Sequence, residues 1–93
     1  MTTLEFIYFI CDEFEEPCED GIEFAKTNPN LLVAIDKLLI DVTNVQFIRW
    51  ACWQEKIIGW SMFNKMARET DYSKTNQKCA EILKKFIADN NLV

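Results

Sequence analysis

The sequence predicts an all-α fold: a compact bundle of five to six short helices around a tryptophan-rich central helix. Hydrophobic residues make up 49% of the chain and recur at helical spacing through most of it. Glycine and proline occur only twice each, too rarely for the turns of a many-stranded sheet. A chain of 93 residues suits one domain, so we expect residues 1–93 to form a single helical domain.

The first segment is expected to be a helix from about residue 3 to residue 14. Thr2 and Glu5 have the spacing of a capping box, and the apolar residues that follow recur every three or four positions. The run from Phe6 to Ile10 also has strong β propensity, so a short strand over residues 4–10 is the alternative.

Two short helices should follow. Pro17 suits the first position of the second helix, which should end near Lys26. Asn28 and Pro29 are typical of an N-cap and the first helical residue, so the third helix should run from there to about Asp41.

The central helix is expected to begin after a cap at Thr43 or Asn44. It is apolar on almost every side, which is typical of a helix in the middle of a fold. Gly59 should end or bend it, and the apolar pattern then continues to about Glu69. The polar residues that follow can cap a last helix that stops near Asn90.

The composition argues against an enzyme or a metal protein. Histidine, the usual general base and a common metal ligand, is absent. No two of the four cysteines have the spacing of structural zinc ligands, and we expect reduced thiols that lie mostly in the core. The two glycines stand alone, so a phosphate-binding loop is excluded. We therefore expect no catalytic, metal-binding or cofactor-binding residues.

Trp50, Trp53 and Trp60 have two interpretations. They could form a stacking platform for bases or a ligand, but core packing is favoured for aromatic residues on a nearly all-apolar helix. A helix-turn-helix is disfavoured because the reading helix would begin with apolar residues, so no direct nucleic-acid contact is expected. No leader or membrane-spanning stretch is recognisable, which predicts a cytoplasmic protein without membrane contact.

Charge is distributed unevenly along the chain. Residues 1–36 contain nine acids and one base, whereas residues 37–93 contain nine bases and six acids. Seven of the acids form what we call the acidic cluster: Asp12, Glu13, Glu15, Glu16, Glu19, Asp20 and Glu23. Glu19 and Asp20 should lie in the first turn of the second helix, where negative charge is favourable.

The rest of the acidic cluster has no such explanation. Asp12 and Glu13 are expected in the last turn of the first helix, where negative charge opposes the helix dipole, and Glu15 adds repulsion beside them. A solvated face is one interpretation. The first binding hypothesis is a protein partner with a basic surface, for which the carboxylates replace the phosphates of nucleic acid. The second is a homo-oligomer in which this cluster meets the basic half of another copy.

The run from Cys18 to Ala25, followed by the run from Phe47 to Trp50, resembles a pattern in small uncharacterised helical proteins of bacteriophages and gut bacteria. Their C-x-x-G-x-x-aromatic-Ala helix precedes an aromatic-rich helix, and the resemblance covers about residues 18–53. Phe24 and Phe47 stand where tryptophan is more frequent. The resemblance implies a phage-type protein in the host cytoplasm. Those proteins have no established activity, so the resemblance assigns no function to any residue.

Size and acidity together are similar to those of phage inhibitors of host defence, such as anti-CRISPR proteins, by analogy only. We therefore expect a non-enzymatic interaction protein of phage or mobile-element type, an inhibitor of a host nucleic-acid-binding protein. The alternative is a small homo-oligomeric structural or accessory protein whose acidic cluster is solvated or self-associates.

Overall fold

Helices make up most of the chain in the computed structural model, which describes residues 1–12, 16–41 and 44–93. The described residues contain no strand, so the predicted all-α fold is confirmed and residues 4–10 are helical. The Cα radius of gyration is 12.1 Å. The helices are α1 (Thr3–Ile10), α2 (Glu19–Thr27), α3 (Leu31–Ile40), α4 (Gln46–Trp53), α5 (Gly59–Glu69) and α6 (Tyr72–Asp89).

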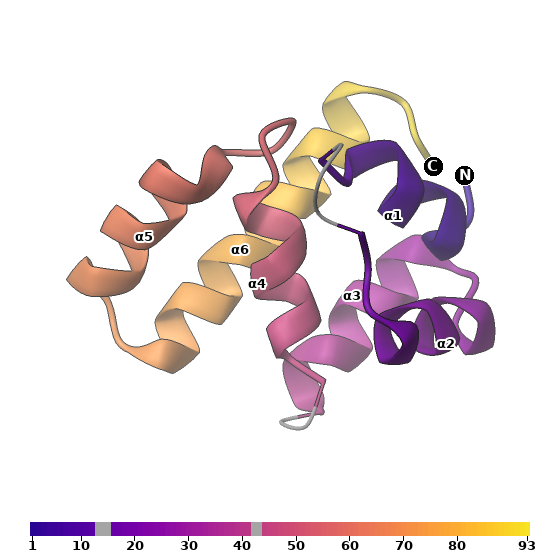
Figure 1. The fold of residues 1–93 in the computed structure, drawn as a ribbon, viewed down its shortest axis with the longest axis horizontal. Helices are drawn as coiled ribbons and strands as arrows, with labels where there is room; N and C mark the ends of the chain where they lie inside the picture. Colours follow the sequence, from indigo (N-terminus) through magenta and orange to yellow (C-terminus); the bar gives the residue numbers. More distant parts are fainter. Residues whose placement is uncertain (13–15, 42–43) are drawn as a thin grey trace.

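Helix α4 lies at the centre, as the sequence predicted. It packs against α3, α5 and α6, with α5 on one side of it and α1, α2 and α3 on the other (Figure 1). Its buried face carries Ile48 and Cys52, which join apolar side chains from α1, α3, α5 and α6 in one core. The two chain ends lie side by side (Figure 1), and the Met1 amino group donates to the Leu92 carbonyl at 3.1 Å.

Helix α1 begins as predicted and ends earlier than predicted. The Thr2 side chain accepts from the Glu5 N–H and the Glu5 carboxylate accepts from the Thr2 N–H, which completes the capping box. The last helical residue is Ile10, not a residue near 14, and Cys11 is the extended C-cap. The helix stops because the Asp12 N–H donates to the Gln54 side chain at 3.0 Å rather than to a carbonyl of α1.

The starts of α2 and α3 are each shifted by two residues from the predicted positions, to Glu19 and Leu31. Cys18, not a residue before Pro17, caps α2, and its sulfur accepts from the Gly21 N–H at 3.3 Å. Asn30, not Asn28, caps α3 through its side-chain oxygen. Asn28 instead closes α2, and its amide donates to a carbonyl of that helix.

The central helix ends earlier than predicted, before it reaches Gly59. Helix α4 ends at Trp53, and Gly59 starts α5 with a φ of +79°, a conformation that favours glycine. The Gln54 carbonyl accepts from the N–H groups of Ile57 and Gly59, which closes the turn between the helices. Val45 precedes α4 without a side-chain cap, so Asn44 does not play the predicted role; Thr43 lies outside the described residues.

An arginine links the three helices of the C-terminal half. Arg49 of α4 donates to the buried Asn76 of α6 at 2.9 Å. Its guanidinium also lies over the rings of Tyr72 and Phe63, 4.4 and 5.1 Å from their centroids. Such contacts hold a partly buried cation that has no carboxylate partner in the part of the chain that the structure describes. They join α5 and α6 to the central helix α4.

Candidate functional site

The structure assigns Asp12 a role in folding. It lies beyond the end of α1, so the predicted conflict with the dipole of that helix is wrong for Asp12. Its backbone N–H binds the Gln54 side chain, and its carboxylate accepts from the Glu55 N–H at 3.2 Å. Asp12 therefore ties the segment after α1 to the turn after α4. Glu13 and Glu15, the other residues of that argument, lie outside the described residues.

Four members of the acidic cluster remain, which we call the acidic edge: Glu16, Glu19, Asp20 and Glu23. All four are exposed, and none forms an ion pair with a residue that the structure describes. Glu19 and Asp20 lie in the first turn of α2, as predicted, where each gains about 0.3–1 kcal/mol from the helix dipole. Glu16 lies before the helix, and Glu23 lies beyond its first turn.

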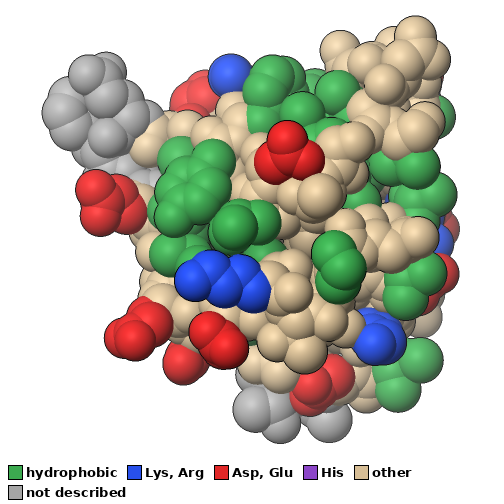
Figure 2. Space-filling view, turned by 90° about the vertical axis from the view of Figure 1, so that its right-hand side faces the viewer, with side chains coloured by type: hydrophobic (Ala, Val, Ile, Leu, Met, Phe, Trp, Pro, Cys, Tyr) green, Lys and Arg blue, Asp and Glu red, His purple; other side chains and the backbone are tan. Residues whose placement is uncertain are grey.

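Acidic and apolar groups lie next to each other on this part of the molecule. In the space-filling view of the side that carries α1, α2 and α3, several acidic side chains lie along one edge, next to hydrophobic side chains (Figure 2). The basic side chains on this face are fewer. Negative potential is therefore concentrated beside an apolar surface, a combination that suits a basic partner with apolar groups.

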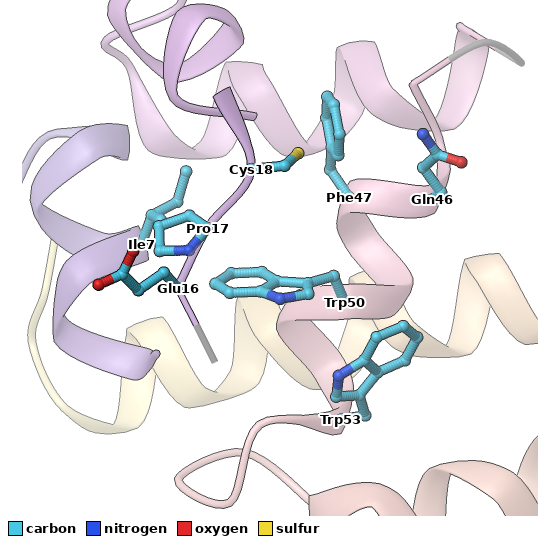
Figure 3. Close-up of a pocket in the computed structure, with 8 residues that line it drawn as sticks. All are labelled: Ile7, Glu16, Pro17, Cys18, Gln46, Phe47, Trp50 and Trp53. Atoms are coloured by element: carbon cyan, nitrogen blue, oxygen red, sulfur yellow. The ribbon is translucent and has the colours of Figure 1, made fainter. Parts of the chain in front are cut away.

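Beside the acidic edge, an open groove of about 380 Å³ separates α4 from α1 and the segment that leads into α2 (Figure 3). Its size falls within the usual range of ligand pockets. One wall consists of Ile7, Glu16, Pro17 and Cys18, and the other of Gln46, Phe47, Trp50 and Trp53.

The Trp50 side chain extends across the groove (Figure 3). Its indole extends from α4 toward Glu16 and Pro17 on the opposite wall (Figure 3). The side chain packs against the core with one part and remains half-buried. Together with Ile7 and Phe47 it also lines a separate, smaller cavity of about 50 Å³. The same three side chains therefore border both hollows.

Glu16 lies between this groove and a more polar hollow. The hollow has a volume of about 350 Å³ and is lined by residues that include Tyr8, Asp12 and Glu16. Glu16 also lines the apolar groove, and it is the one charged residue that does so among the described residues. A ligand in the groove would therefore have a carboxylate at its edge.

No pattern in the sequence predicts the groove. The sequence favours core packing for the tryptophans, and Trp50 and Trp53 do pack against the core, each with part of its surface at the groove. Trp60 on α5 is instead 54% exposed. The available signal was that α4 is apolar on nearly every side: only one face can pack into the core. Ile48 and Cys52 occupy that face, and Trp50 lies on another.

The four cysteines divide into two buried and two accessible thiols, so the expectation of mostly core thiols holds for half of them. Cys52 and Cys79 are fully buried and Cys11 is half-buried, whereas Cys18 is exposed at the groove; none forms a disulfide. A hydrogen bond with the Cys79 thiol, together with burial, raises the pKa of Cys52 above its ordinary value. Cys52 therefore stays a neutral thiol within the core.

No three His, Cys, Asp or Glu side chains among the described residues come together as a metal site would require. Within the same residues, no helix combines the length and the apolar character needed to cross a membrane.

Comparisons of the chain with models of protein families, with curated proteins and with solved structures find no match.

Proposed function

We propose that this protein acts by binding a basic surface of a partner protein through the acidic edge. The observation that carries the proposal is that Glu16, Glu19, Asp20 and Glu23 are exposed, close in sequence and without an ion-pair partner among the described residues. The helix dipole accounts for the first-turn pair, but not for Glu23. A basic partner surface would stabilise all four carboxylates together and accelerate association by electrostatic steering.

The finer part of the proposal concerns the consequence of binding. A protein surface rich in lysine and arginine often binds the phosphates of nucleic acid. Carboxylates held on such a surface would compete with those phosphates. We therefore propose an inhibitor of a nucleic-acid-binding protein, of the kind that a phage or mobile element directs against its host, rather than an enzyme.

Affinity capture from an extract of the native host tests this function. The decisive variant combines Glu16→Lys with Glu23→Lys, which leaves the favourable first-turn carboxylates of α2 in place. The matched control combines Glu69→Lys with Glu81→Lys, two exposed acids on α5 and α6, and changes the net charge equally. The wild type and the control should capture the same partner at low salt and lose it as salt rises. Capture by the edge variant, or no partner at either salt, would refute the proposal.

Self-association is a second candidate, favoured by the exposed apolar side chains of α3. Leu32, Val33, Leu39 and Ile40 are all exposed, and Ile40 is 84% accessible. Burial of this face in a second copy would stabilise a dimer by the hydrophobic effect. Sedimentation velocity over a range of concentrations should then show a shift from monomer to dimer that Ile40→Glu abolishes. A monomer at all concentrations would exclude this candidate.

A further inference from the structure

The groove beside the acidic edge has the anatomy of an anchoring pocket. Its walls are mainly apolar, with Ile7 and Pro17 facing Phe47 and Trp50 across an open volume of about 380 Å³ (Figure 3). The strongest contacts in protein interfaces are commonly large side chains inserted in such pockets, surrounded by a polar rim. Here Glu16 and Gln46 supply polar groups to the lining.

The negative charge of Glu16 indicates which kind of residue should lie next to an apolar anchor in the partner. Glu16 is exposed, lines the groove and forms no ion pair with a described residue. Elsewhere in the molecule, aromatic rings are covered by cations: Arg49 lies over Tyr72, and Lys56 lies 4.3 Å from the ring centroid of Phe9. No described cation lies over Trp50. An incoming arginine or lysine could therefore contact both this indole and the Glu16 carboxylate.

We propose that the groove holds one large apolar side chain of a basic protein segment, and that a lysine or arginine next to that side chain pairs with Glu16. The inference rests on the proposed function and specifies the partner: a segment in which basic residues flank an aromatic or aliphatic anchor. A protein segment fits better than a small cation, because the acidic edge continues from Glu16 to Glu23 along α2 and offers further carboxylates to the flanking basic residues.

Three short synthetic peptides provide the probe. The first has a central phenylalanine flanked by lysine and arginine, the second replaces the phenylalanine by serine, and the third keeps the phenylalanine but replaces the basic residues by glutamate. Phenylalanine rather than tryptophan serves as the anchor, so that every indole N–H signal in the spectra comes from the protein. We expect the first peptide to bind at least about tenfold more tightly than the second, and the third not to bind.

The indole N–H signals of the protein locate the binding. In ¹H–¹⁵N correlation spectra, the first peptide should shift the Trp50 indole signal more than that of Trp60, which lies outside the groove lining and contacts it through Trp53. Trp50→Leu should reduce the affinity for the first peptide to that for the second. Trp60→Leu is the matched control and should keep the tenfold preference. If Trp50→Leu does not fold, the wild-type spectra still decide between the outcomes.

Several results would overturn this inference, and they differ from failure of the proposed function. Equal binding of the first two peptides, or an unmoved Trp50 indole, would show that the groove holds no anchor. Tight binding of the third peptide would show an apolar ligand without need of basic residues, and a Trp50 shift that depends on protein concentration alone would show a second copy there. In each case the Glu16→Lys and Glu23→Lys variant still tests the acidic edge separately, through its capture of the partner.

Discussion

Replacement of Gln54 by methionine should destabilise the protein strongly. The side chain is fully buried; its oxygen accepts from the Asp12 N–H at 3.0 Å and its amide donates to the Trp50 carbonyl at 2.8 Å. Methionine has a similar size but makes neither hydrogen bond. Each buried polar group left without a hydrogen-bond partner costs about 1–3 kcal/mol. Part of this cost is offset because the apolar methionine side chain is more favourable in the core than an amide. We expect a loss of about 2–4 kcal/mol.

Urea unfolding followed by circular dichroism measures this loss directly. The control is Gln77→Met, at an exposed position of α6, which should change the free energy of unfolding by no more than about 0.5 kcal/mol. If Gln54→Met were as stable as this control, Gln54 would not hold the segment after α1 against the end of α4, and Asp12 would again lack a role in folding.

Three further predictions concern a helix cap, a carboxyl group and the thiols. Asp71 caps α6 by accepting from a backbone N–H at 2.8 Å, so Asp71→Ala should cost about 1 kcal/mol in the same unfolding assay, and an unchanged midpoint would contradict the cap. Hydrogen bonds from Thr2, chiefly from its backbone N–H, lower the pKa of Glu5. Its stabilising effect is therefore present above the unfolded pKa and lost as pH falls through the lower folded value. The stability difference between the wild type and Glu5→Gln should shrink as the pH falls from about 6 to about 3, and a constant difference would argue against this role. Iodoacetamide should modify the exposed Cys18 first and the two buried thiols only after unfolding; intact mass spectra with more than two adducts in native buffer would contradict the described core.

The sequence predicts features of this fold that depend on near neighbours. The capping box of Thr2 and Glu5 joins residues three positions apart, and it forms where the spacing places it. The end of α1 is different. It depends on Gln54, which lies 42 positions from Asp12, and no local pattern indicates that a buried glutamine will accept the next backbone N–H.

The same distinction applies to the candidate site. The first-turn placement of Glu19 and Asp20 follows from the start of a single helix, and it was predicted. The groove forms only because Pro17 and Trp50, which come from distant segments of the chain, lie on its opposite walls. Hydrophobic periodicity shows that α4 has more apolar surface than one core face can bury, but not which neighbour leaves the remainder open.

The most direct test of the central claim is the dissociation constant for the captured partner, measured with purified proteins. The Glu16→Lys and Glu23→Lys variant should bind at least about tenfold more weakly than the wild type at low salt, and the difference should narrow as salt rises. The Glu69→Lys and Glu81→Lys control should bind like the wild type. Equal weakening of both variants would mean that net charge matters and the acidic edge does not.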